Sequence, residues 1–185
     1  MNLTAKKRAG ETKGETKQIR RSGNIPAVFY APGETGISIE IDGPEFAAAM
    51  RNIKQGHLST TIFTLNVDGK KKKAIVKGIQ YELTSYDVIH LDFEELKDDI
   101  PVTVKVPVEC VGLADCVGVK LGGFLRQIIR NVKVKCLPKD IPSEFALDIS
   151  ELKIKQSKRL SDITMPKGVN PIAAADEVVA VIAKR

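Results

Sequence analysis

Apolar residues recur at every second position in several short segments of this chain, and such alternation predicts half-buried strands rather than helices. The alternation is clear at 37–41, where three isoleucines are separated by polar residues, and at 101–110, where valines alternate with other residues. Asp68-Gly69 predicts a tight two-residue hairpin between two further apolar segments. Many short strands joined by tight turns favour a β-barrel or β-sandwich.

One segment has the spacing of a helix instead. Phe46, Met50 and Ile53 share one face, Pro44 suits a first helical position, and Gly56 ends the segment. The predicted strands are 25–30, 37–41, 62–67, 74–81, 87–93, 101–110, 131–137, 144–149 and 177–183, and 157–163 is read as a short helix. We therefore expect a mainly β fold with a few short helices.

The stretch 94–99 is polar and acidic and precedes a new predicted strand, so it is the best candidate for a domain boundary. A chain of 185 residues has room for one or two domains. We predict two domains, 1–96 and 97–185, that are joined without a flexible Gly/Ser linker.

Composition excludes several classes of protein. The longest apolar stretches, such as 178–183, fall far short of the ~20 residues of a membrane span. The first residues lack the apolar core of a secretory signal, and three cysteines fit a reducing compartment better than a disulfide framework. Aromatic residues make up 5% and Trp is absent, which disfavours a broad base-stacking surface.

Basic residues gather at two places. Residues 1–25 hold seven bases and two acids, a pattern typical either of an arm that attracts polyanions or of a solvated, disordered tail. Lys70-Lys71-Lys72-Lys73 follows the predicted hairpin, where it is read as a solvated tip that protects a strand edge or as an accessory phosphate contact. Charge alone leaves these alternatives open.

No metal site or catalytic motif is predicted. Cys110, Cys116 and Cys136, together with two histidines 33 residues apart, lack the usual spacing of zinc ligands, so we expect the cysteines to be small core residues. The segment 118–123 lacks the spacing of the glycine-rich loops that hold phosphate.

The segment 13–30 is more informative, because it places basic residues directly before a strand. If 17–21 forms a helical turn, Lys17, Arg20 and Arg21 lie on roughly one side and Ile19 points away, where it can anchor the turn. Guanidinium groups held in this way can pair with phosphate or with a guanine edge.

This segment resembles the bacterial large-subunit ribosomal protein twenty-five family, which includes the general stress protein Ctc, in its long two-domain form. The matching motifs are Lys13-Gly14, Ile19-Arg20, Gly23-Asn24-Ile25-Pro26-Ala27-Val28-Phe29-Tyr30, Ile89-His90-Leu91-Asp92-Phe93, Gly118-Val119-Lys120-x-Gly122-Gly123-x-Leu125, Ile141-Pro142, Asp148-Ile149-Ser150-x-Leu152 and Pro166-x-Gly168-Val169. Together they span nearly the whole chain.

The resemblance implies an N-terminal six-stranded antiparallel β-barrel with flanking helices, followed by a second, mostly antiparallel β domain. It implies a structural component of the large ribosomal subunit that binds 5S ribosomal RNA and is neither an enzyme nor a cofactor-binding protein. Expected partners are that RNA, the large subunit and neighbouring ribosomal proteins through the second domain, with no membrane and no DNA, in the cytoplasm. The implied RNA contacts are Arg8, Lys13, Thr16, Lys17, Arg20, Tyr30, Lys77, Gln80, His90 and Asp92.

Some residues depart from the family pattern or have a simpler interpretation. Lys17 stands where the family more often has Arg, Glu15 places an acid inside the basic segment, and Ala31 replaces a usual Gly. Taken without the resemblance, His90 and Asp92 read as a satisfied pair on one strand. A stress-induced factor that visits the ribosome is the alternative function.

Overall fold

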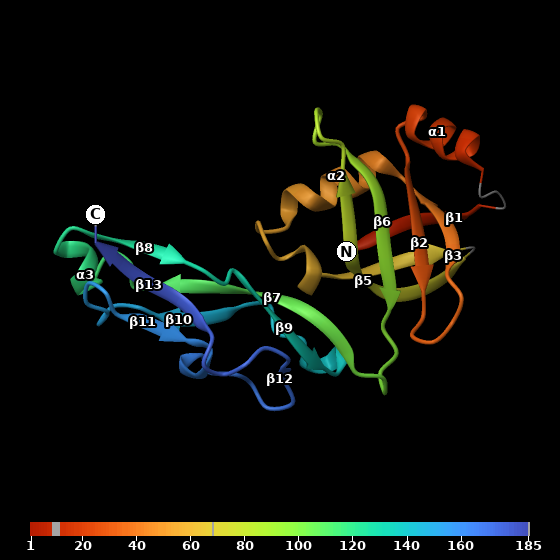
Figure 1. Ribbon diagram of the computed structural model, residues 1–185. Coiled ribbons are helices and arrows are strands. Elements are labelled where there is room, and N and C mark those ends of the chain that lie inside the picture. Colours follow the sequence, from red (N-terminus) through yellow and green to blue (C-terminus); the bar gives the residue numbers. More distant parts are fainter. Residues whose placement is uncertain (9–11, 68, 185) are drawn as a thin grey trace. The chain divides into compact units, whose positions relative to one another are not determined.

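The computed structural model describes residues 1–8, 12–67 and 69–184 (Figure 1). The chain forms two compact units, Met1–Ile100 and Pro101–Arg185. The division falls four residues after the sequence-based boundary, and Glu94 and Glu95 of the predicted connecting stretch lie in a strand. No helix in the described ranges is long and apolar enough to cross a membrane.

The first unit consists of short strands and two helices. In chain order its elements are β1 (Asn2–Lys7), α1 (Lys13–Arg21), β2 (Ile25–Tyr30), β3 (Ile37–Ile41), α2 (Gly43–Asn52), η1 (Leu58–Thr60), β4 (Ile62–Val67), β5 (Lys70–Tyr81) and β6 (Val88–Glu95). Asp68 of the predicted hairpin lies outside the described residues, whereas Gly69 has a φ of +80°, the left-handed conformation that glycine adopts without strain.

The six strands close into a barrel in the order β1-β3-β2-β6-β5-β4, which confirms the predicted six-stranded barrel with helices beside it. The expectation that the barrel is wholly antiparallel needs correction, because β1 pairs with β4, and β2 with β6, in parallel. Tight turns cannot join parallel neighbours, and both pairs are indeed far apart in sequence. Such long-range pairings leave no local sequence signal.

The first strand corrects the view of residues 1–25 as an arm or a tail. Asn2–Lys7 is a strand of the barrel that pairs with β3 on one side and β4 on the other. Leu3 and Ala5 point into the core, while the polar residues between them point outward. Two small apolar anchors in a charged segment are enough because the strand pairs on both of its edges.

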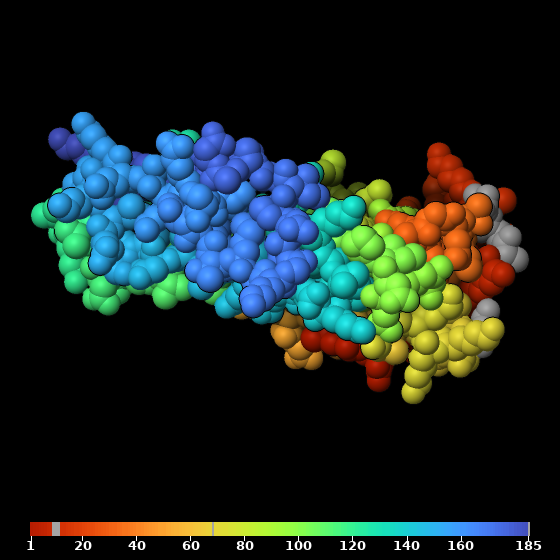
Figure 2. Space-filling view, turned by 90° about the horizontal axis from the view of Figure 1, so that it is seen from below, coloured from red at the N-terminus to blue at the C-terminus, as the bar shows by residue number. Residues whose placement is uncertain are grey.

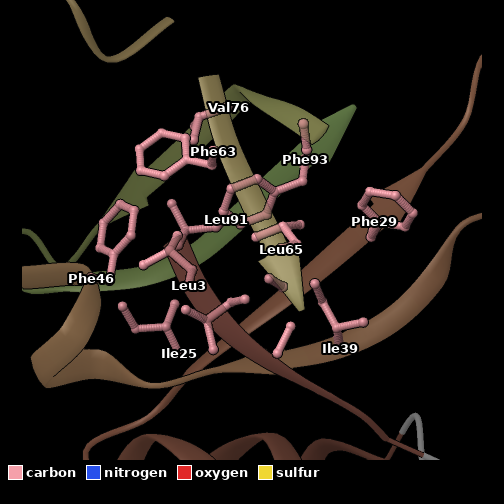
Figure 3. Packing of buried hydrophobic residues seen from close by; sticks show 14 residues of the cluster. Leu3, Ile25, Phe29, Ile39, Phe46, Phe63, Leu65, Val76, Leu91 and Phe93 are labelled. Atoms are coloured by element: carbon pink, nitrogen blue, oxygen red, sulfur yellow. The ribbon is translucent and has the colours of Figure 1, made fainter. Parts of the chain in front are cut away.

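Three phenylalanines meet inside the barrel core. Phe46 from α2 packs against Phe63 of β4, with ring centroids 6.3 Å apart, and Phe63 meets Phe93 of β6 edge to face at 6.1 Å (Figure 3). All three rings are fully buried. Large aromatic side chains contribute much apolar area, and aliphatic residues such as Leu3, Ile39 and Leu91 complete the buried cluster around them.

The second unit contains two sheets, one with the order β10-β7-β9-β12 and one with the order β11-β13-β8. Its elements are β7 (Val102–Val111), α3 (Val117–Lys120), β8 (Gly123–Gln127), β9 (Asn131–Cys136), η2 (Pro138–Asp140), β10 (Phe145–Asp148), β11 (Ser157–Arg159), η3 (Leu160–Asp162), β12 (Asn170–Pro171) and β13 (Val178–Lys184). Only β10 and β7 pair in parallel, so the mostly antiparallel domain is confirmed within the described residues.

One local prediction in this unit needs refinement. The segment 157–163, read as a short helix, begins as strand β11 and continues as a single 3₁₀ turn, η3. Pairing of β11 with β13 holds the first part extended, since tertiary pairing overrides weak local preferences.

Candidate nucleic-acid interface

Helix α1 has the capping and charge pattern of a stable but exposed helix. The Thr12 hydroxyl accepts a hydrogen bond from the Glu15 amide at 3.4 Å, and Glu15 lies in the first turn. Arg20 and Arg21 lie in the last turn, where positive charge suits the helix dipole. The helix begins at Lys13, four residues before the predicted turn. None of its residues is fully buried, and Thr16 and Ile19 are half-buried while the others are exposed.

Two cations of α1 are free for a ligand. Lys13 and Lys17 are exposed, and neither has an ion-pair partner in the part of the chain that the structure describes. Arg8 differs, because it is half-buried at the end of β1 and its Nη1 donates to the Thr16 hydroxyl at 3.4 Å. Thr16 in turn donates to the Thr12 carbonyl at 3.1 Å. Arg8 and Thr16 therefore tie the helix to the first strand.

Arg20 links the helix to the barrel. Its Nε donates to the Ile89 carbonyl at 3.1 Å, one residue before His90 in β6. This bond leaves the terminal nitrogens of the guanidinium to face a ligand. The basic helix and the outward face of β6 are therefore parts of one continuous surface.

The barrel face beside α1 is formed by the outward side chains of β2, β5 and β6. The alternation of β6 buries Leu91 and Phe93 and turns His90 and Asp92 outward. Gln80 of β5 lies directly opposite His90 in the ladder, and Tyr30 ends β2 on the neighbouring strand. Five residues of the predicted set are thus collected here: Tyr30, Lys77, Gln80, His90 and Asp92.

His90 and Asp92 lie side by side on β6, as the simpler interpretation expected, but the pair is not fully satisfied, because no hydrogen bond from the described residues reaches His90 Nδ1. His90 Nδ1 lies 3.1 Å from Asp92 Oδ1, and the two side chains are 21% and 38% exposed. Nδ1 is buried and makes no hydrogen bond within the described part of the chain, so the contact with Asp92 is one of proximity, and the ring keeps a second nitrogen, Nε2, that can donate or accept. Being paired with Asp92 and contacting a ligand are therefore compatible roles for His90.

Gly78 makes room for this pair. It lies opposite Asp92, at an irregularity in the β5–β6 register. A Cβ atom at this position would overlap the Asp92 carboxylate, so any larger residue would displace it. Gly78 had no role among the sequence-based predictions; a glycine within a predicted strand is the signal that could have identified it.

The surroundings of Lys77 and Tyr30 shift the pKa of both side chains. Lys77 Nζ lies 2.6 Å from Glu94 Oε2, and burial lowers the pKa of the Lys77 ammonium. Burial, and then the negative charge of Asp92, raise the pKa of Tyr30, which keeps its phenol protonated as a hydrogen-bond donor. Lys77 is thus engaged by Glu94, an acid that belongs to the predicted connecting stretch.

The lysine run is not uniform. Lys72 Nζ lies 3.1 Å from Glu95 and 5.2 Å from the centroid of the Phe29 ring, so it packs on the barrel rather than projecting as part of a solvated tip. Lys70, Lys71 and Lys73 are exposed, and the side chains of this hairpin (yellow) stand out from the surface in Figure 2. The two predicted roles, a solvated tip that protects a strand edge or an accessory phosphate contact, therefore apply to Lys70, Lys71 and Lys73 only.

The cysteines lie within the second unit. Cys116 and Cys136 are buried, Cys110 is half-buried, and all three are free thiols. Burial raises the pKa of Cys110 and Cys136, with a further contribution from Asp140 at Cys136, so these thiols are held in their neutral form. Cys116 Sγ donates to the Leu152 carbonyl at 3.4 Å. These positions agree with core packing.

Comparisons with known proteins match both units. The family described as "Ribosomal L25p family" matches residues 3–93, and the family described as "Ribosomal protein TL5, C-terminal domain" matches residues 101–185. The chain is 45% identical over 185 residues to the "Large ribosomal subunit protein bL25" of Chlamydia trachomatis serovar L2, and 44% identical to those of Chlamydia muridarum and Chlamydia pneumoniae. Each alignment covers the whole of both chains.

Proposed function

The chain belongs to the ribosomal L25p family, in its long form with a TL5-type C-terminal domain, and from this premise we propose how it binds RNA. It is a structural component of the large ribosomal subunit, located on the ribosome in the cytoplasm, and not an enzyme. Its RNA is 5S ribosomal RNA, the RNA that this family binds. In our proposal the first unit carries the interface, on α1 and the outer face of β2, β5 and β6.

The observation that carries this proposal is the hydrogen bond from Arg20 to the Ile89 carbonyl. It sets a helix with exposed cations beside the strand that carries His90 and Asp92, so phosphates and base edges of one RNA segment can be contacted together. Sequence-specific recognition of RNA relies on irregular loops whose base edges and 2′-hydroxyls are accessible. The barrel face, which gathers the donors and acceptors of Tyr30, Gln80 and His90 on neighbouring strands, is suited to such a loop.

The two parts of the surface would then act differently. Lys13, Lys17 and the terminal nitrogens of Arg20 would contact phosphates, because they are exposed cations. Gln80, His90 and Tyr30 would exchange hydrogen bonds with bases or 2′-hydroxyls. Arg8 and Thr16 would support α1, since each already contacts its neighbour.

A titration of the full chain with purified 5S ribosomal RNA tests this function. We expect saturable binding of one protein per RNA that weakens as salt rises, because phosphate contacts release counterions. An unrelated RNA hairpin of equal length is the control. Equal affinity for both RNAs would contradict the proposal, because the barrel face would then contribute no recognition.

A further inference from the structure

The outer face of β7 and β9 in the second unit carries lysines that face one another. Valines alternate along both strands and point into the core, so the residues between them point to solvent. Lys105 of β7 lies directly opposite Lys133 of β9 in the antiparallel ladder, and Lys135 lies two residues further along β9 on the same face. All three side chains are exposed.

This arrangement is unfavourable for the isolated protein. Like charges directly opposite each other on neighbouring strands are destabilising. Among the described residues, none of Lys105, Lys133, Lys135 and the nearby Arg130 has an ion-pair partner, and the one acid on the same face of β7 is Glu109. A bound polyanion would turn this repulsion into attraction.

The face is also hollowed where the cations meet. A groove of about 460 Å³ is lined by Lys105, Ile128, Ile129, Arg130, Asn131 and Lys133. Ile128 is 56% exposed at its edge. Two lysines and one arginine around an amide side chain can hold phosphate oxygens while apolar atoms contact sugar.

The charge of the two units supports an RNA partner for this face. Residues 101–185 hold 14 bases and nine acids, a net charge of +5, whereas residues 1–100 hold 15 bases and 14 acids, a net charge of +1. The unit outside the proposed 5S interface is therefore the more basic of the two. A net charge of this kind favours a polyanion over a typical protein surface.

We propose that the β7–β9 face, defined by Lys105, Arg130, Lys133 and Lys135, is a second RNA-binding surface. Its ligand is the phosphate backbone of a ribosomal RNA segment outside 5S ribosomal RNA. This proposal rests on the proposed function, because it assumes that the protein resides on the large subunit. Cations spaced along a sheet face suit contacts to the phosphate backbone and carry no sequence readout.

A charge reversal in the full chain tests the proposal, because its two effects have opposite signs. Lys133→Glu places an acid opposite Lys105, so the thermal midpoint of the free protein should rise or stay unchanged. Binding to large subunits depleted of this protein should weaken, and log affinity against log salt should flatten by at least one contact, roughly 0.7–0.9 in slope. Affinity for isolated 5S ribosomal RNA should not change.

Lys153→Glu is the matched control. Lys153 is exposed, follows β10 outside the β7–β9 face, and does not line the groove, so the same change in charge there should leave subunit binding close to wild type. Equal losses for the two variants would overturn the proposal, since only net charge would then matter. Unchanged subunit binding of the Lys133→Glu variant would overturn it as well.

The titration with 5S ribosomal RNA distinguishes failure of this surface from failure of the proposed function. Crosslinking distinguishes an RNA partner from a protein partner. If the wild-type chain fails to bind 5S ribosomal RNA, the proposed function fails, while the subunit measurement still judges the β7–β9 face. Zero-length crosslinks that join Lys105 or Lys133 to carboxylates of a ribosomal protein would assign the face to an acidic protein surface and overturn an RNA partner. Photo-crosslinks from Lys133 to large-subunit RNA would support it.

Discussion

Helix α1 and the barrel face beside it offer an RNA very different surfaces. The helix buries none of its residues, and its lysines are exposed and free of ion pairs in the described part of the chain. On the barrel face, His90 lies beside Asp92 and Lys77 beside Glu94, and the side chains of His90 and Lys77 are 21% and 27% exposed. The helix carries exposed charge, whereas the barrel face carries hydrogen-bonding groups that are partly covered by their neighbours.

The balance of charge reinforces this difference. Around His90, the barrel face carries two acids, Asp92 and Glu94, beside Lys77, so this part of the face cannot provide the bulk of the attraction to a polyanion. Phosphate contacts contribute most of the affinity and position the protein, while contacts to bases carry the sequence information. Single substitutions should therefore affect one of the two parts more than the other.

The largest expected effect comes from Gly78→Ala. The new Cβ would overlap the Asp92 carboxylate, and because that carboxylate is the end of a side chain it can swing away while the strand stays folded. Both Asp92 and its partner His90 would lose their positions. Specific binding to 5S ribosomal RNA should therefore fall by more than the ~1–3 kcal/mol expected for one base-edge contact, as measured by titration.

Gly14→Ala in α1 is the control for Gly78→Ala. No atom outside the helix lies within 4 Å of a Cβ at Gly14, so alanine fits and should strengthen the helix. Binding should stay at or slightly above the wild-type level. If Gly78→Ala binds as tightly as Gly14→Ala, the geometry of the His90–Asp92 pair is unimportant for RNA binding.

His90→Ala should remove recognition without removing attraction. The substitution removes a hydrogen-bonding side chain and none of the Lys or Arg cations, so the salt dependence of binding should stay nearly unchanged. Affinity for 5S ribosomal RNA should fall by about 1–3 kcal/mol, by analogy with base-edge contacts in DNA, while an unrelated hairpin is bound as before. Thermal melts must first show that the variant is folded, because His90 lies within β6.

Arg20 and Lys13 should show the opposite behaviour. Arg20→Ala and Lys13→Ala each remove one cation, and each should flatten log affinity against log salt by roughly 0.7–0.9. Arg20→Ala should weaken binding more, because it also breaks the tether to the Ile89 carbonyl. Arg20→Lys separates the two effects, since it keeps the charge and the salt slope but loses the bond from Nε.

Two results would contradict the expected division of roles between helix α1 and the barrel face. A salt slope for His90→Ala that flattens as much as that of Arg20→Ala would show that the barrel face also acts through charge. An equal loss of affinity for 5S ribosomal RNA and the unrelated hairpin on His90→Ala would lead to the same conclusion.

Local patterns predicted the strands that carry clear alternation. Ile25–Tyr30 and Ile37–Ile41 were placed with the correct bounds, and α2 was recognised from the spacing of Phe46, Met50 and Ile53. Strand β1 was missed because only Leu3 and Ala5 are buried in it and basic residues follow directly. Its place in the barrel depends on pairing with β3 and β4, which no local signal reveals.

The site was predicted as a set of residues, not as an arrangement. The resemblance named the members of the set, but the tether from Arg20 to Ile89 and the ion pair of Lys77 with Glu94 join residues far apart in sequence. Such contacts depend on the closure of the barrel. The sequence also did not show that Arg8 and Thr16 contact each other, which gives both a supporting role.

The smallest expected effect concerns the second unit and 5S ribosomal RNA. Residues 1–100 form a compact unit that contains α1 and the whole barrel face, so we predict that this piece folds and binds the RNA nearly as tightly as the full chain. Circular dichroism should show a folded β protein, and the affinity for 5S ribosomal RNA should differ from that of the full chain by less than tenfold, about 1.4 kcal/mol.

The β7–β9 face is expected to contact other ribosomal RNA, so its loss should appear in binding to the large subunit instead. A folded piece that binds 5S ribosomal RNA more than tenfold more weakly would show that the second unit contributes directly to this interface. The 5S interface would then comprise three surfaces rather than two.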